Sequence, residues 1–121
     1  MTSPLVGLRV LVVEDELLLA LDLQAILEEA GCKVIGPAMR VDQALQRIAE
    51  EVIEAAVLDV NLGHETVFPV ADALAERRLP FVFLSGYDRD TLPERFHDRP
   101  LLGKPYSISA LLVLLQEPLR S

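Results

Sequence analysis

The sequence predicts an α/β protein whose parallel β-sheet is covered by helices on both faces. Short runs rich in Val, Leu and Phe alternate with amphipathic segments along the whole chain, which is the pattern of repeated strand and helix units. The apolar runs hold almost no polar residue before their last position, as expected of strands buried on both faces. Strands of this kind are joined by right-handed helical crossovers.

The first strand is predicted over residues 8–13 (LRVLVV), and it ends at the acidic pair Glu14 and Asp15. A helix is predicted over residues 16–30, because leucine, isoleucine and alanine recur there at helical spacing. Gly31 follows at the position where helices often end on glycine, so the helix is expected to stop there.

The middle of the chain repeats this arrangement. A second strand is predicted over residues 33–37, and a helix over residues 41–52, where apolar residues recur at spacings of three and one. Residues 55–59 (AAVLD) form another apolar run that closes on an acid. A third helix is predicted over residues 67–74, and an aromatic and β-branched strand over residues 81–85 (FVFLS) ends in a hydroxyl.

The segment of residues 87–100 has the weakest helical pattern. It is charged and contains Pro93, which a helix accepts only near its first turn, so any fourth helix is short. A brief strand is predicted over residues 101–103. Ser107 is then expected to cap a final helix that continues through residues 110–116.

This final helix is apolar on nearly every side rather than along one stripe. The residues that can face the sheet are Ile108, Leu111, Leu112 and Leu115. Val113 and Leu114 then point elsewhere, and we expect their surface to be a protein interface, for a second copy in a homodimer or for another partner.

Length and composition limit the classes of protein. A chain of 121 residues with 51% hydrophobic residues can bury a core unaided, and we expect a single domain over residues 1–121 with no output domain. The single cysteine, Cys32, forms no intramolecular disulfide, which favours a reducing compartment, the cytoplasm. No export signal and no apolar run of about 18 residues is present, so no membrane span is expected. The net charge of −8 argues against binding to nucleic acid and favours protein partners.

Polar side chains collect where the predicted strands end. Glu14 and Asp15 follow the first strand, Asp59 the third, Ser85 the fourth and Lys104 the fifth. In open parallel sheets ligands bind beyond these carboxyl ends. Three close carboxylates repel one another, and a hard cation such as Mg²⁺ relieves that repulsion. With Lys104 and Ser85 contacting phosphoryl oxygens, Asp59 is left as the nucleophile.

Taken singly, these residues have simpler interpretations. Glu14 and Asp15 suit the N-cap and acidic first turn of a helix, and Asp59 suits a loop cap. Lys104 beside a proline and Ser85 beside a glycine suit ordinary turns. Their placement at successive strand ends favours the site.

The acidic pair, Asp59 closing a hydrophobic strand, Ser85, and Lys104 followed by proline resemble the receiver domain of two-component response regulators. The resemblance runs from the first predicted strand to the last helix. It implies a flavodoxin-like, doubly wound (βα)5 fold with a five-stranded parallel sheet in the order 2-1-3-4-5, and Asp59, Lys104 and Ser85 as catalytic residues. We therefore expect a stand-alone response regulator that catalyses only its own phosphorylation and dephosphorylation.

The resemblance also implies the ligands and partners. Asp59 is the phosphoacceptor, Asp15 and Asp59 ligate Mg²⁺, Glu14 does so through water, and Asn61 does so through its backbone carbonyl. The phosphoryl donor is a phosphohistidine on a sensor histidine kinase or on a histidine phosphotransfer protein.

A narrower resemblance covers residues 59–74 (DVNLGHETVFPVADAL) and 81–106 (FVFLSGYDRDTLPERFHDRPLLGKPY), which are similar to the FAT GUY receivers of alphaproteobacteria. The Phe-Ala-Thr-Gly signature of that group reads FLSG at residues 83–86.

Leu101 departs from the family pattern, since most receivers place Tyr or Phe three residues before the lysine. The usual signal through a moving aromatic ring is therefore not expected here. Tyr87 and Asn61 occupy positions that in the family tune how readily water reaches the acyl phosphate.

Two other functions are compatible with parts of the pattern. A haloacid-dehalogenase-type phosphatase also uses an aspartyl nucleophile with Mg²⁺, but that family requires a second Asp where this chain has Asn61. A degenerate receiver would bind partners without phosphorylation, but the retained acids, Ser85 and Lys104 argue against that function.

Overall fold

The computed structural model describes residues 3–86 and 89–120, and it contains one five-stranded parallel sheet in the order β2-β1-β3-β4-β5. The strands are β1 (Arg9–Val13), β2 (Lys33–Ala38), β3 (Ala55–Asp59), β4 (Phe81–Ser85) and β5 (Leu101–Gly103). The predicted α/β class and strand order are both confirmed.

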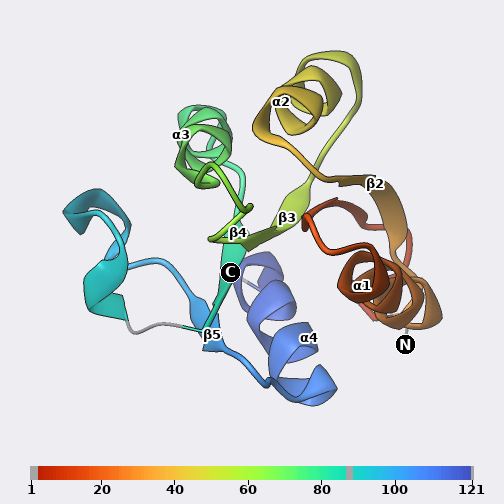
Figure 1. The fold of residues 1–121 in the computed structure, drawn as a ribbon. Coiled ribbons are helices and arrows are strands. Elements are labelled where there is room, and N and C mark those ends of the chain that lie inside the picture. The colour runs from red at the N-terminus through yellow and green to blue at the C-terminus, as the bar shows by residue number, and fades with distance from the viewer. Residues whose placement is uncertain (1–2, 87–88, 121) are drawn as a thin grey trace.

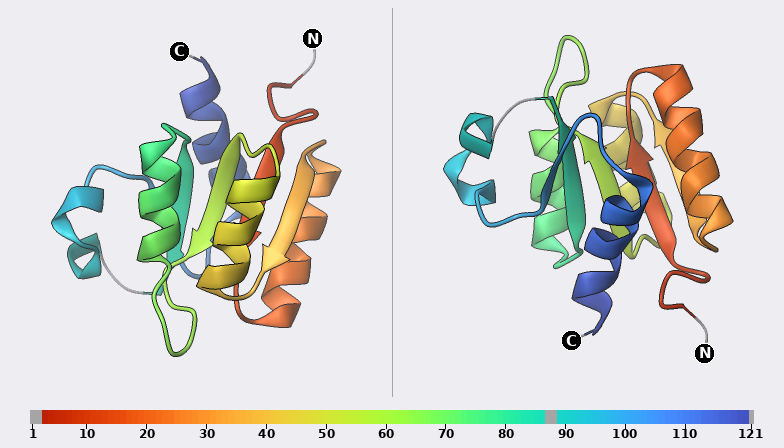
Figure 2. Two further views of the ribbon diagram at one scale, coloured as in Figure 1. Left: turned by 90° about the horizontal axis from the view of Figure 1, so that it is seen from above. Right: turned by 90° about the horizontal axis from the view of Figure 1, so that it is seen from below.

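Helices cover both faces of this sheet. They are α1 (Leu17–Glu29), α2 (Val41–Glu50), α3 (Phe68–Glu76) and α4 (Ile108–Gln116). Figure 1 shows α2 and α3 on one face and α1 and α4 on the other, and the two views in Figure 2 show the same three layers. The arrangement explains why the strands are apolar along almost their whole length.

One helix of the expected (βα)5 pattern, predicted to be short at most, is absent from the described residues. Between β4 and β5 the described residues form two single 3-10 turns, η1 (Arg89–Thr91) and η2 (Glu94–Phe96), and no α-helix. Pro93 lies between the turns in an extended conformation, where it has no N–H to donate to a continuous helix. The prediction about Tyr87 falls outside the described residues.

The core forms two layers, one on each side of the sheet. Val13, Leu58 and Phe83 contribute to the layer beneath α2 and α3. Val12 and Leu84 contribute to the layer beneath α1 and α4. Because alternate residues of the same strand enter opposite layers, both faces of the central strands lie out of solvent. The polar groups of these strands therefore reach solvent only at the strand ends.

Glycine ends α1 as the sequence predicts. Gly31 adopts a positive φ of 99°, a conformation that side chains rarely allow. Its N–H donates to the Glu28 carbonyl and the Cys32 N–H donates to the Leu27 carbonyl, at 3.0 and 2.9 Å. These two bonds satisfy carbonyls at the end of the helix in a Schellman motif. The chain then turns directly into β2.

The last helix buries only part of its apolar surface. Leu111 and Leu115 are buried against the sheet, and Val113 is 51% exposed, as predicted. The prediction that Leu114 also points away from the core is wrong, because Leu114 is partly buried against the core layer beneath α1 and α4. The expectation that Ile108 faces the sheet is wrong, because it begins the helix beyond β5 and is 52% exposed. Ser107 caps the helix by accepting a hydrogen bond from the Ala110 N–H at 3.1 Å, as predicted.

Among the described residues, every helix is too short or too polar to cross a membrane.

Candidate functional site

The carboxyl ends of four strands bring the predicted site residues to one edge of the sheet. Asp59 is the last residue of β3 and Ser85 is the last of β4. Glu14 follows β1 directly, and Lys104 follows β5. The Lys104 N–H donates to the Ser85 carbonyl at 2.9 Å, which fixes the lysine beside the end of β4. Sheet pairing therefore assembles side chains that are far apart in the sequence.

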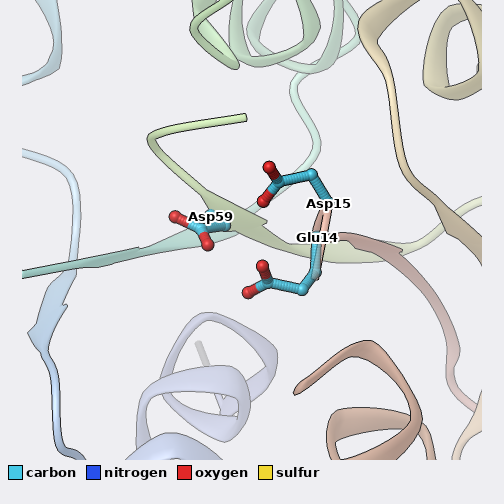
Figure 3. Close-up of side chains that lie close together, drawn as sticks. All are labelled: Glu14, Asp15 and Asp59. Carbon is cyan, nitrogen blue, oxygen red and sulfur yellow. The ribbon is translucent and has the colours of Figure 1, made fainter. Parts of the chain in front are cut away.

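Three carboxylates meet at this edge. Oxygen atoms of Glu14, Asp15 and Asp59 all lie within 4.8 Å of one another, and Figure 3 shows their side chains close together. Glu14 and Asp59 are only 1% and 5% exposed. Negative charges packed this closely and shielded from water repel one another strongly unless a cation joins them.

Lys104 supplies one such cation. Its Nζ lies 2.8 Å from Asp59 Oδ2 and 3.6 Å from Glu14 Oε2. Burial opposes the ammonium charge, but the Asp59 carboxylate, and less strongly Glu14, hold the pKa of Lys104 above its ordinary value. The lysine is therefore charged at neutral pH, and its ammonium group faces a cluster of three carboxyl groups.

A cavity of about 520 Å³ opens at this cluster. It is lined by all six predicted site residues, which are Glu14, Asp15, Asp59, Asn61, Ser85 and Lys104. Sequence reasoning missed Glu16, Gly63 and Gly86, which also line it. Gly63 could have been found from the sequence, because it is a glycine in the loop that follows the strand ending in Asp59. The structure gives it a positive φ of 79°, which glycine adopts readily.

The simpler interpretation of the acidic pair as a helix cap does not fit. Helix α1 begins at Leu17 with Glu16 at its N-cap position, and no acidic residue lies in its first turn. Glu14 Oε1 instead accepts a hydrogen bond from the Glu16 N–H at 3.1 Å. The side chain of Glu14 is thereby held toward the cavity and away from the helix.

The cluster suits a hard divalent cation. Glu14 Oε2 is buried and has no hydrogen-bond partner, which is a costly state for a carboxylate oxygen. The cluster offers carboxylate oxygens, and Mg²⁺ prefers oxygen ligands of this kind. The residues present therefore fit the ion that the sequence analysis expects.

Without a metal, Glu14 makes the stability of the protein depend on pH. Burial raises the pKa of Glu14 from 4.5 to about 8, and the nearby Asp59 carboxylate adds to the rise. A group whose pKa is higher in the folded state than in the unfolded state contributes its full stabilisation at pH values below the unfolded-state pKa. That contribution is lost as the pH rises through the folded-state pKa. In a chelator, the free energy of unfolding is expected to fall between about pH 5 and pH 8 by on the order of a few kcal/mol.

Urea unfolding at several pH values measures this loss. The Glu14→Gln variant keeps the size of the side chain and cannot ionise, so its unfolding free energy is expected to change much less over the same range. An equal slope in the variant and the natural protein would assign the pH dependence to other groups.

Comparisons with known proteins agree with this geometry. Residues 10–114 match the sequence profile of the response regulator receiver domain. The phyllosphere-induced regulator PhyR of Methylorubrum extorquens is 31% identical in an alignment 120 residues long, which covers 92% of this chain and 43% of PhyR. Sensory transduction protein LytT of Bacillus cereus is 33% identical in an alignment 88 residues long, which covers 70% of this chain and 36% of LytT. The chain thus spans less than half the length of these curated relatives.

Solved structures are similar over nearly the whole chain. The solution structure of SdrG from Sphingomonas melonis is 41% identical, with a TM-score of 0.78 over 92% of this chain and 94% of SdrG. A CheY-like receiver domain protein from Methanospirillum hungatei shares the fold, with a TM-score of 0.82 and 22% identity over 94% of each chain. Since the family profile extends from β1 into α4 and the same strands carry the acidic cluster, this chain belongs to the response regulator receiver domain family.

Proposed function

We propose that this receiver domain accepts a phosphoryl group on Asp59, in a reaction that requires Mg²⁺. The observation that carries the proposal is the position of Asp59, a buried carboxylate with Lys104 Nζ at 2.8 Å and two further acids beside it. A carboxylate in this setting is an activated acceptor, because its neighbours can balance the charge of an incoming phosphoryl group. The donor is proposed to be a phosphohistidine on a sensor histidine kinase or a histidine phosphotransfer protein.

Each residue has a role in this transfer. An oxygen of Asp59 attacks phosphorus, the bond from phosphorus to the imidazole nitrogen of the donor breaks, and the electron pair of that bond stays on the imidazole. Lys104 neutralises one phosphoryl oxygen, and the Ser85 hydroxyl donates to another. Glu14, Asp15, Asp59 and the Asn61 carbonyl would hold Mg²⁺, which when bound neutralises negative charge on the carboxylates and the phosphoryl group. Attack of water on the product returns Asp59 and releases phosphate.

Intact mass measurement tests the proposal. The protein is incubated with Mg²⁺ and either acetyl phosphate or a phosphoramidate, and one added phosphoryl group is expected. The addition should vanish in excess chelator. An unchanged mass with both donors would support the degenerate receiver, and turnover of unrelated phosphate esters would support the phosphatase.

The proposed protein donor needs a surface beside the cavity. Helix α1 begins two residues after the acidic pair and carries three exposed leucines, Leu17, Leu18 and Leu21, which are 57%, 76% and 48% exposed. We refer to these three residues as the leucine face. Exposed apolar side chains at this density are typical of protein contacts. A donor seated there would bring its imidazole to the adjacent cavity.

The Leu18→Ala variant is expected to impair phosphoryl transfer from a protein donor but not from a small-molecule donor. Transfer from a phosphorylated histidine phosphotransfer protein is expected to slow about tenfold, since truncating an interface anchor typically costs 1–2 kcal/mol. Labelling by acetyl phosphate should not change. Val52→Ala is the matched control, because Val52 is 66% exposed and does not line the site cavity. If Leu18→Ala and Val52→Ala accept the phosphoryl group from the protein donor at the same rate, the leucine face does not bind the donor.

The exposed part of α4 is proposed to contact a second copy of the chain or an output partner. Ile108 and Val113 are each about half exposed, which leaves apolar surface uncovered on this helix. Light scattering at high concentration, with and without a phosphoryl analogue, distinguishes the two. If the protein is monomeric in both conditions, contact with a second copy is excluded and the output partner remains. We also propose a cytoplasmic location, which the single buried cysteine supports.

A further inference from the structure

The side chain of Glu65 ties the loop of residues 61–66, called here the site loop, to helix α2. Glu65 Oε2 accepts a hydrogen bond from the Val41 N–H at 2.9 Å, and Val41 is the first residue of α2. The backbone carbonyl of Glu65 accepts the Leu62 N–H, also at 2.9 Å. One residue thus closes the turn of the loop and anchors it to another element.

The opposite side of the site loop touches the acidic cluster. The Asn61 N–H donates to Asp59 Oδ1 at 3.1 Å, and Asn61 Oδ1 accepts from the Gly63 N–H at the same distance. Asn61 and Gly63 both line the cavity. A Cβ added to Gly63 would lie 3.3 Å from Asp15 Oδ2, so the loop backbone packs directly on that carboxylate. Movement of the loop therefore moves atoms at the site.

Helix α2 needs the partner that Glu65 provides. The first N–H groups of a helix have no acceptor within the helix. Arg40 occupies the N-cap position and its side chain makes no capping hydrogen bond. The Glu65 carboxylate supplies the missing acceptor from another part of the chain, and its negative charge suits the positive end of the helix dipole. The hydrogen bond thus pairs an N–H that α2 cannot satisfy itself with a carboxylate that the helix dipole stabilises.

We propose that Glu65 is a positioning residue, which holds the site loop, and with it Asn61 and Gly63, beside the acidic cluster through its bond to Val41. The role rests on the proposed function, since it concerns the binding of Mg²⁺ and phosphoryl groups. Coupling between two sites is reciprocal. Ligand at the acidic cluster should therefore strengthen the bond between Glu65 and the Val41 N–H.

Calorimetric titration with Mg²⁺ alone tests the positioning role. Glu65→Ala is expected to weaken Mg²⁺ binding about three- to tenfold, the range that follows from losing one hydrogen bond. Glu65→Gln keeps an acceptor oxygen and is expected to bind within about twofold of the natural protein. Glu54→Ala is the matched control, since Glu54 Oε1 makes the same kind of bond to the Arg9 N–H, at 3.0 Å, at the opposite end of β1. An equal loss in Glu54→Ala would overturn the role by indicating a general loss of stability.

A double-mutant cycle tests the contact itself. Val41→Pro removes the N–H at the first helical position, where proline is well accepted. Like Glu65→Ala, it should weaken Mg²⁺ binding. Once one partner is gone, removing the other is expected to add little. Fully additive effects would overturn the proposal. Should Glu65→Ala fail to fold, Val41→Pro and Glu65→Gln still test it.

Hydrogen exchange gives a readout that does not depend on phosphorylation. Mg²⁺ should slow exchange of the Val41 amide in the natural protein and have no such effect in Glu65→Ala. If the natural protein binds Mg²⁺ and takes up a phosphoryl group while Glu65→Ala matches it in affinity and exchange, the positioning role alone is wrong. If the natural protein does neither, the proposed function is wrong as well.

Discussion

Replacement of Asp59 by asparagine is expected to abolish phosphoryl uptake from every donor. The carboxylate oxygen is the proposed nucleophile, and a neutral amide neither attacks phosphorus readily nor forms an acyl phosphate. Asparagine has nearly the same shape, so the 5% exposed position at the end of β3 should keep its packing. Intact mass after incubation with Mg²⁺ and acetyl phosphate measures the result, and the mass of Asp59→Asn should not change.

The control for Asp59→Asn is the same change at Asp22. Asp22 is an exposed acid of α1 that does not line the cavity of the acidic cluster, so Asp22→Asn should label like the natural protein. A phosphoryl group on Asp59→Asn would mean that a different residue accepts it. Peptide mapping would then identify that residue, and the neighbouring Asp15 is the first to examine.

The site was predictable because a parallel sheet converts sequence position into spatial position. Asp59 and Lys104 are 45 residues apart, and their side chains meet because Asp59 ends β3, Lys104 follows β5, and the carboxyl ends of both strands lie at the same edge of the sheet. The strands were predictable for the same reason, since burial on both faces leaves continuous apolar runs. Ser85 was found by this rule as well, as the polar residue that closes such a run.

Other features depend on tertiary contacts that periodicity does not contain. The burial of Glu14, and hence its raised pKa, follows from packing around the end of β1. The bond between Glu65 and Val41 joins two segments with no shared pattern. The segment between β4 and β5 was recognised as a poor helix from Pro93, but its 3-10 turns and the role of Phe96 were not predicted.

Phe96 is an aromatic residue in a largely charged segment, and together with Leu92 it enters the core. It lies 2% exposed in a cluster with three other rings, at centroid distances of 5.5 Å from Phe83, 5.8 Å from Phe68 and 6.2 Å from Phe81. Leu101 of β5 packs partly buried against the same core layer. The ring of Phe96 thus fills space beside β4 and anchors a segment that has no helix to hold it.

Phe96→Ala is therefore expected to lower the free energy of unfolding by about 3–5 kcal/mol, the usual cost of emptying a buried aromatic site. Urea unfolding in the presence of a chelator measures the change. Arg95→Ala is the control in the same turn, because its solvent-exposed ion pair with Asp72 and the contact of its guanidinium with the Phe96 ring, 4.5 Å from the centroid, contribute much less than a buried ring. A loss for Phe96→Ala no larger than that of Arg95→Ala would mean that the segment separates from the sheet at little cost, and that the aromatic cluster does not anchor it.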